Sequence, residues 1–232
     1  MSWTSGVGRA CGVLLDAIVR MLALTRINPN ILTLMGLAVN TYAAFLFGYA
    51  NGENQRRMFF YAGLVIIGSG FFDLVDGRVA RASNQVTRFG GFFDSVVDRY
   101  SDASLFFGLL VFYARGNRFF YVVLTALVMI SAIMVSYARA RAESLIGTCR
   151  VGFMERPERL VLLIIGALFN VMAPVLWVIA VLSTITVIHR IVYTWKRTQE
   201  MEAAPAGRAA VPPGRAPPPS SGCGLRWRPR LR

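Results

Sequence analysis

The chain has 232 residues, of which 55% are hydrophobic and only 16% are charged, and its mean hydropathy is +0.51. This composition excludes an ordinary soluble domain and is typical of a protein that crosses the membrane several times. The formal net charge of +13 could indicate a nucleic-acid-binding protein. However, the basic residues follow the expected membrane topology, so we expect no nucleic acid among the partners.

The first predicted element is an amphipathic segment, Val7–Leu24, within residues 1–26. Its apolar residues gather on one side, while Arg9, Asp16 and Arg20 lie elsewhere. We therefore expect an N-terminal helix that lies in the membrane interface. A seventh membrane span is the weaker interpretation because charged residues interrupt the segment.

Six apolar segments follow and predict a transmembrane domain over residues 27–198. They are Ile31–Ala50, Met58–Asp76, Gly90–Tyr113, Phe119–Ala138, Leu160–Met172 and Pro174–Trp195. The fifth is shorter than the roughly 20 residues that span a bilayer, so we expect its helix to begin near Pro157, a residue favoured in a first helical turn. The predicted fold class is an all-α integral membrane protein with six transmembrane helices.

Charge counting predicts the orientation of these helices. An even number of spans places both termini on one side, and residues 199–232 form a Pro- and Arg-rich tail that we expect to be disordered. Of the 25 Lys and Arg residues, the loops on the opposite side contain only Arg56, Arg57, Arg115 and Arg118. The positive-inside rule therefore predicts a multi-pass plasma-membrane protein with cytoplasmic termini.

Four aspartates, Asp73, Asp76, Asp94 and Asp98, stand out in this apolar chain. Carboxylates near hydrocarbon need a strong compensating partner. Spacings of three and four residues point each pair to one face of a helix. The topology places both pairs at the cytoplasmic surface, where the loop Val79–Phe89 joins their helices. Four convergent carboxylates suit one or two hard divalent cations, so we predict a metal site there.

The neighbours of the aspartates favour displacement at phosphorus. Two metal ions can neutralise a pyrophosphate and stabilise both the attacking and the leaving oxygen. Gly77 leaves room for a nucleotide, Arg81 offers a permanent positive charge to a phosphate, and Gly90 would let the two helices pack closely. A cation transporter is the alternative from another class, but it should show an internal repeat, and we find none.

A second group of charges concerns the acceptor of the reaction. The connection between the fourth and fifth spans, residues 136–160, contains five arginines, and Glu155 and Glu158 can hold some of them in place. Arginine clusters suit an acceptor that itself bears a phosphate, although a plain positive-inside bias would give the same composition. Asp102 lies one helical turn beyond Asp98, and we expect it to form a structural ion pair with an arginine such as Arg99.

The aspartate run resembles the signature of the CDP-alcohol phosphotransferase family. The pattern Asp73-x2-Asp76-Gly77-x2-Ala80-Arg81-x8-Gly90-x3-Asp94-x3-Asp98 contains all eight fixed residues at every spacing. The resemblance covers the chain to about Trp195. It implies transfer of the phosphatidyl group from CDP-diacylglycerol to an alcohol, with release of CMP, by a protein that contacts membrane lipids and is commonly a homodimer.

The resemblance also implies roles for single residues. The four aspartates would hold magnesium or manganese, with two ions expected, and Asp98 would also be the base that deprotonates the acceptor hydroxyl. The positions implied for the CDP side are Asn30, Ile31, Leu32, Thr33, Gly77, Arg81 and Thr87.

Residues 136–160 are similar to the corresponding segment of phosphatidylinositol phosphate synthases, which join inositol 1-phosphate to a CDP-lipid. By position, the acceptor phosphate would be bound by Arg139, Arg141, Arg159 and Arg190. Arg139 stands where a lysine often occurs in those enzymes. The alternatives within the family are glycerol 3-phosphate, which would give phosphatidylglycerophosphate, and free inositol.

Overall fold

The computed structural model describes residues 29–82 and 87–203, with the backbone alone for Pro29 and residues 73–82. These ranges contain six helices and no strand. The helices are α2 (Pro29–Tyr49), α3 (Gln55–Ala82), α4 (Arg88–Arg115), α5 (Phe119–Ile146), α6 (Arg156–Leu168) and α7 (Met172–Ala203). The interfacial helix predicted within residues 1–26 lies outside the described part of the chain. Of the predicted disordered tail, residues 199–232, the first five residues are helical as the end of α7, and the remainder lies outside the described part.

Each predicted apolar segment coincides with one helix, but several helices continue past the predicted ends. The helix α3 runs to Ala82 and α5 runs to Ile146. The expected loop Val79–Phe89 and the expected connection 136–160 are therefore partly helical. The physical reason is that hydropathy marks the part of a helix that suits hydrocarbon, whereas Ala, Arg and Glu continue a helix readily beyond it. Pro157 lies in the first turn of α6, as predicted.

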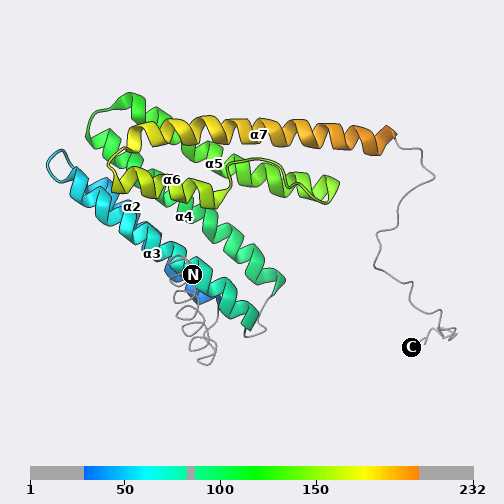
Figure 1. The fold of residues 1–232 in the computed structure, drawn as a ribbon, viewed down its shortest axis with the longest axis horizontal. Helices are drawn as coiled ribbons and strands as arrows, with labels where there is room; N and C mark the ends of the chain where they lie inside the picture. The colour runs from blue at the N-terminus through cyan, green and yellow to red at the C-terminus, as the bar shows by residue number, and fades with distance from the viewer. Residues whose placement is uncertain (1–28, 83–86, 204–232) are drawn as a thin grey trace, which may run out of the picture.

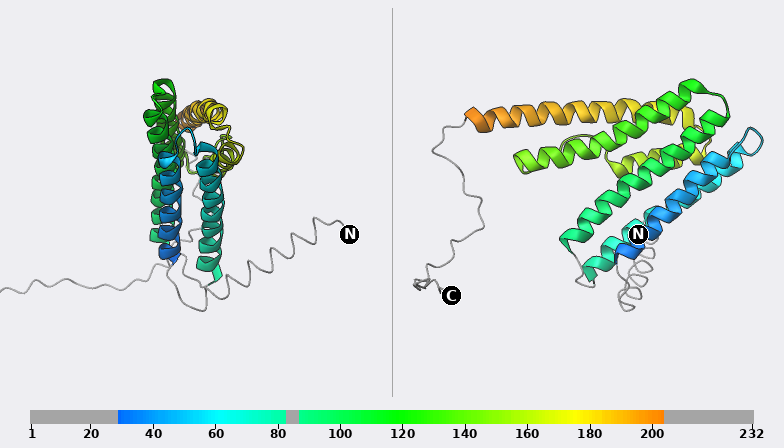
Figure 2. Two further views of the ribbon diagram at one scale, coloured as in Figure 1. Left: turned by 90° about the vertical axis from the view of Figure 1, so that its left-hand side faces the viewer. Right: turned by 180° about the vertical axis from the view of Figure 1, so that it is seen from behind.

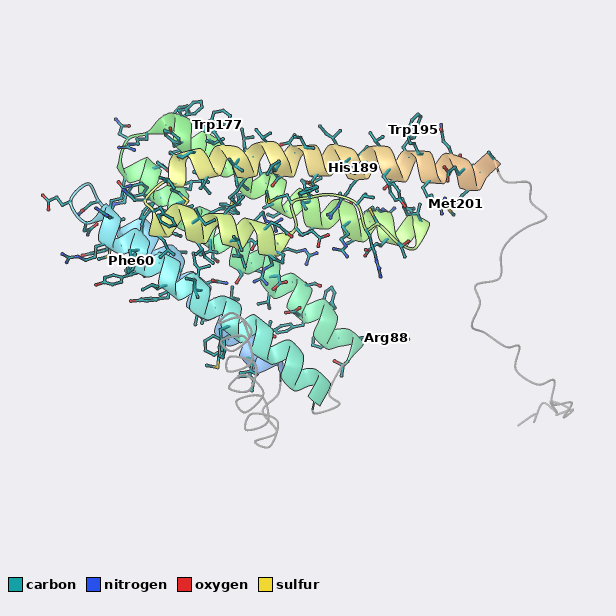
Figure 3. The ribbon with its side chains drawn as sticks, in the orientation of Figure 1. Phe60, Arg88, Trp177, His189, Trp195 and Met201 are labelled. Carbon is teal, nitrogen blue, oxygen red and sulfur yellow. The ribbon has the colours of Figure 1, made fainter. Side chains whose placement is uncertain are left out.

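The protein has the surface of a membrane protein. Three helical segments are long and apolar enough to cross a bilayer: Asn30–Tyr49, Phe119–Ile146 and Met172–Ala203. Large apolar side chains such as Phe60, Trp177 and Trp195 are exposed on the outside (Figure 3). Such a surface is costly in water and suits contact with lipid.

The helices form a closed ring of neighbours. The helix α2 packs against α3 and α4, α5 packs against α4 and α7, and α6 packs against α3 and α7. Two groups are visible, α2–α4 and α5–α7, which converge where α4 joins α5 and diverge toward the opposite end (Figures 1 and 2). The beginning of α4 and the end of α5 therefore lie on the diverging side.

The apolar core holds the ring together at the converging side. Phe59 of α3 lies between Phe47 of α2 and Phe112 of α4, with ring centroids 5.0 and 4.9 Å apart. Leu163 of α6 and Leu176 of α7 belong to the same buried cluster. This side is thus a packed apolar structure, and the polar residues gather elsewhere.

The close approach of α2 and α4 depends on Gly108. A Cβ atom added at Gly108 would lie 2.7 Å from the Cα of Ala44 and closer still to its carbonyl oxygen. Real Cβ atoms do not approach backbone this closely, so the two helices would have to separate.

We predict that Gly108→Ala destabilises the protein by about 1–3 kcal/mol, the usual cost of overpacking a core. Thermal unfolding of the detergent-solubilised protein measures the effect. The control is Gly91→Ala on the same helix, where an added Cβ meets nothing within 4 Å. Equal unfolding temperatures for the two variants would contradict the close contact.

Candidate active site

A polar cavity of about 390 Å³ lies where α4, α5, the start of α6, and α7 meet. Its lining is rich in charged side chains from distant parts of the chain. They are Asp98, Arg99, Asp102, Arg139, Glu143, Glu155, Arg156, Arg159 and Arg190. The cavity therefore brings the last aspartate of the motif together with three of the four arginines predicted to bind the acceptor.

Asp94 and Asp98 are fixed by the first turns of α4. Thr87 caps this helix, because its hydroxyl accepts a hydrogen bond of 2.9 Å from the Gly90 amide. The two carboxylates then follow one helical turn apart and share a face. Asp94 is exposed, whereas Asp98 is partly buried and lies 2.9 Å from the Nη1 atom of Arg156.

Asp73 and Asp76 lie on the last turns of α3, where the backbone is helical to Ala82. Their spacing of three residues in a helix agrees with a shared face. Their side chains lie outside the described part of the structure, as does the side chain of Arg81. Convergence of the four carboxylates therefore stays a prediction.

The starts of α2 and α4 bring together two residues predicted for the CDP side. A Cβ atom added at Gly90 would lie 3.0 Å from Oγ1 of Thr87 and 3.6 Å from Oδ1 of Asn30. We expected Gly90 to let the two aspartate helices pack closely. That packing stays a prediction, because the side chains at the end of α3 lie outside the described part; among the described side chains, Asn30 of α2 is a close neighbour of Gly90.

Three further predicted CDP-side residues, Ile31, Leu32 and Thr33, follow Asn30 on α2. Ile31 is 52% exposed, whereas Leu32 and Thr33 are buried at 4% and 7%. The three side chains therefore do not form one surface. Thr33 is the polar residue among them, and it is buried.

The predicted acceptor arginines separate into two sets. Arg139 contacts Glu143 at 3.0 Å and Glu155 at 2.7 Å. Arg159 donates a 2.5 Å hydrogen bond to Asp102. Arg141 is exposed and does not line the cavity. Because α5 stays helical here, residues two apart face different directions.

Arg190 of α7 is 1% exposed and binds three groups of the protein. Its guanidinium donates to the carbonyl oxygens of Val151 at 2.8 Å and Val135 at 2.5 Å, and to Glu155 at 3.2 Å. It therefore joins α5, α7 and the segment before α6. Its first role is to build the cavity wall. Glu155 also holds Arg139, as the sequence suggested, whereas Glu158 is exposed and does not line the cavity.

Sequence reasoning missed the role of Arg156. It contacts Asp98, and its Nε atom lies 3.5 Å from Oδ1 of Asp102. The ion pair predicted for Asp102 exists, but its partners are Arg156 and Arg159 rather than Arg99, which donates to the carbonyl oxygen of Ser95. The spacing of Arg156 and Arg159, three residues apart at a helix start, was the available signal.

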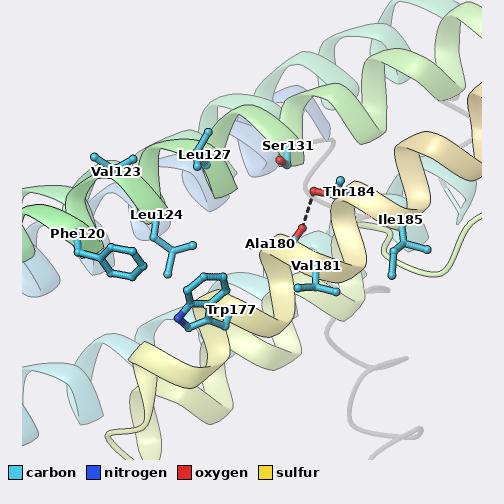
Figure 4. A pocket seen from close by; sticks show the side chains of 10 residues that line it. All are labelled: Phe120, Val123, Leu124, Leu127, Ser131, Trp177, Ala180, Val181, Thr184 and Ile185. Atoms are coloured by element: carbon cyan, nitrogen blue, oxygen red, sulfur yellow. Dashed lines mark hydrogen bonds between the residues drawn. The ribbon is translucent and has the colours of Figure 1, made fainter.

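A second cavity, of about 470 Å³, lies between α5 and α7 (Figure 4). Phe120, Leu124, Trp177 and Ile185 dominate its lining, and the hydroxyl of Thr184 donates to the carbonyl oxygen of Ala180 at 2.8 Å. This apolar groove suits hydrocarbon. Charged substrates fit the polar cavity far better.

A membrane protein that is all-helical over its described residues, with a cavity lined by carboxylates and arginines, has the form of an enzyme that acts on charged groups. The sequence profile described as CDP-alcohol phosphatidyltransferase matches residues 26–203. The chain belongs to this family and is therefore a transferase.

The chain is also similar to individual members of this family. The chain is 40% identical to the archaetidylinositol phosphate synthase of Pyrococcus horikoshii, over 81% of this chain and 93% of that protein. It is 34% identical to the phosphatidylinositol phosphate synthase of Streptomyces avermitilis, over 79% of each.

Solved structures show the same fold. The phosphatidylinositol phosphate synthase of Mycobacterium tuberculosis with CDP-DAG bound has a TM-score of 0.69 at 30% identity and covers 78% of this chain and 93% of its own. A second structure of that enzyme, in complex with manganese and citrate, has a TM-score of 0.68 at 30% identity, with coverage of 78% and 88%.

Gly152, in the segment before α6, allows a test of the cavity wall. Gly152 has a φ of 113°, and an added Cβ would lie 2.6 Å from Cγ2 of Thr186 and 3.1 Å from Nε of Arg190. We expect Gly152→Ala to displace Arg190 and to lower CMP release at least about tenfold, since a small misplacement of binding groups can cost that much or more.

The control is Gly147→Ala, whose φ of 80° makes it similarly strained, although nothing lies within 4 Å of an added Cβ. Backbone strain alone would affect both variants, whereas the crowding argument applies only to Gly152. Equal CMP release by the two variants would show that Gly152 has no special role in the cavity.

Proposed function

We propose that the protein transfers the phosphatidyl group of CDP-diacylglycerol to inositol 1-phosphate and so forms phosphatidylinositol phosphate and CMP. The main observation in favour is the polar cavity, where Asp98 of the family motif and Arg139, Arg159 and Arg190 share one lining. Relatives named archaetidylinositol and phosphatidylinositol phosphate synthases support the same acceptor. Family membership in a transferase class also argues against the cation-transporter alternative.

The arginines explain why the acceptor would bear a phosphate. Arg159 is 2% exposed, and its Nε and Nη1 atoms are buried without a hydrogen-bond partner among the described residues. Buried polar groups normally have partners, and guanidinium donors match phosphate oxygens in geometry and charge. A phosphate in the cavity would supply the missing acceptors.

The carboxylates explain how the reaction would proceed. Asp98 would accept the proton of the acceptor hydroxyl, whose oxygen then attacks the phosphorus on the lipid side of the pyrophosphate. The bond from that phosphorus to the oxygen of CMP breaks, and CMP leaves with the electron pair. Arg156, at 2.9 Å, would orient the carboxylate of Asp98 before this transfer.

We propose that Asp73, Asp76, Asp94 and Asp98 hold two divalent cations, magnesium or manganese. The fit rests on their chemistry, since all four offer hard oxygen ligands, and Asp94 and Asp98 share one face at the start of α4. Bound ions of this kind neutralise a pyrophosphate and stabilise the attacking and leaving oxygens. The manganese complex of the Mycobacterium tuberculosis enzyme supports divalent metal use.

The CDP side of the substrate would lie near the starts of α2 and α4. Asn30 and Thr87 meet there around Gly90, while Gly77 and Arg81 are on the last turns of α3. We further propose that all six helices enter the membrane and that the cavity and both termini face the cytoplasm, because the basic residues are concentrated on that side. The plasma membrane and a homodimer remain predictions.

The first test is the choice of acceptor. Purified protein with CDP-diacylglycerol and Mg²⁺ is offered inositol 1-phosphate, free inositol or glycerol 3-phosphate, and CMP release is measured. We expect kcat/KM for inositol 1-phosphate to exceed that for inositol at least about 100-fold, because two charge-assisted hydrogen bonds each contribute about 1.5–3 kcal/mol. Activity with glycerol 3-phosphate and none with inositol 1-phosphate would contradict the acceptor but not the reaction class.

The second test concerns the carboxylates. We expect Asp98→Asn to lower kcat about 100-fold or more, since the amide cannot accept the proton, and general bases typically contribute at least this factor. Glu53→Gln, in the exposed turn after α2, is the control and should leave kcat unchanged. Normal turnover of Asp98→Asn would rule out the proposed base.

Metal removal is a separate test of the same site. Chelation of divalent cations should abolish CMP release, and added Mg²⁺ or Mn²⁺ should restore it, because uncompensated carboxylates would repel the pyrophosphate. Full activity in the presence of excess chelator would contradict the metal site.

A further inference from the structure

The residue that connects the cavity to Asp98 is Asp102, which lies outside the family motif and which we expected to be only structural. Asp102 as a whole residue is 5% exposed. Oδ2 accepts a 2.5 Å hydrogen bond from Arg159, and Oδ1 lies 3.5 Å from Nε of Arg156. Two arginines of the cavity wall therefore share this one carboxylate.

Arg156 divides its guanidinium between two acids on one face of α4. Its Nη1 lies 2.9 Å from Asp98, and its Nε lies 3.5 Å from Oδ1 of Asp102, one helical turn further on, in an ion pair without a hydrogen bond. The two acids therefore share Arg156. If Asp102 lost its charge, Asp98 would keep the whole of that attraction, and the position of its carboxylate would change.

The guanidinium of Arg159, in contrast, has only some of its donors satisfied. Its Nη2 is bound to Asp102, while Nε and Nη1 are buried without a partner among the described residues. A buried ion pair whose only role is to neutralise charge is expected to satisfy its donors. Here Asp102 fixes one part of the guanidinium and leaves the rest unsatisfied beside the cavity.

We propose that Asp102 is a positioning residue that determines acceptor recognition: it holds Arg159 ready for the acceptor phosphate and, through Arg156, sets the orientation of Asp98. The inference rests on the proposed function for the identity of the acceptor. The new element is a coupling between the binding of the acceptor phosphate by Arg159 and the orientation of the base, Asp98. That coupling passes through Asp102 and Arg156 and not through the metal ligands alone.

The test is a double-mutant cycle of Asp102→Asn and Arg156→Gln in the full-length protein, with kcat and both KM values measured for inositol 1-phosphate and CDP-diacylglycerol. We expect Asp102→Asn to raise KM for inositol 1-phosphate about tenfold or more and to change KM for CDP-diacylglycerol less than twofold. In kcat, the double variant should lose less than the product of the two single losses, because both changes disturb the position of the Asp98 carboxylate. Asp102→Glu should recover part of the loss.

Two results would overturn the proposal. One is an equal rise in both KM values, which would indicate a general structural role for Asp102. The other is multiplication of the two single effects in the double variant, which would show that Asp102 and Arg156 act independently. Glu200→Gln breaks the exposed pair with Arg197 at 2.7 Å and is the control for removal of an acid; it should leave all constants unchanged.

If Asp102→Asn fails to fold in a thermal-unfolding assay, Arg156→Gln decides alone, since Arg156 is less buried than Arg159. Unchanged kcat and unchanged KM for the acceptor would then overturn the proposal. If the wild-type protein uses glycerol 3-phosphate and not inositol 1-phosphate, the proposed acceptor is wrong. The same cycle is then measured with glycerol 3-phosphate, whose phosphate would meet the same arginines, and the same shifts are expected.

Discussion

The ion pair between Asp102 and Arg159 is the interaction on which the polar side of this structure depends. Both side chains are almost fully buried, at 7% exposure for Asp102 and 2% for Arg159, inside a protein whose outer surface is apolar. Charges at such depth are tolerated only with good partners. The pair joins α4 to α6, which are not neighbours in the ring of helices. The ion pair therefore connects two helices on opposite sides of the ring, and this connection forms part of the cavity wall.

Further ion pairs connect the other charged residues of the cavity wall to one another. Arg156 joins Asp102 to Asp98, and Glu155 joins Arg139 to Arg190. Asp102 and Glu155 each hold two arginines, so much of the cavity wall consists of shared ion pairs. Such a wall keeps the guanidinium groups in fixed positions, and fixed donors recognise a phosphate at a lower entropic cost than mobile ones.

The sequence predicted the helices well because apolar segments of this length have few alternatives in a membrane. It was less successful at helix ends, where Val79–Ala82 and the residues up to Ile146 continue as helix. This error had a consequence for the site. Arg139 and Arg141 were treated as parts of one connection, but on a helix they face different directions, and only Arg139 lines the cavity.

Contacts between distant residues could not be predicted in the same way. Asp102 and Arg159 are separated by 57 positions, and Arg190 reaches Val135 across 55. Local spacing identifies which residues share a helix face but not which face meets which. For that reason the aspartate motif was visible in the sequence, whereas the roles of Arg156 and Asp102 required the structure.

The most direct measurement for the account is an experimental structure of the protein with inositol 1-phosphate bound. We predict the phosphate in the cavity between α4, α5, α6 and α7, within hydrogen-bonding distance of Arg159, with the inositol ring toward Asp98. A phosphate bound at the exposed Arg141, or elsewhere outside this cavity, would contradict it.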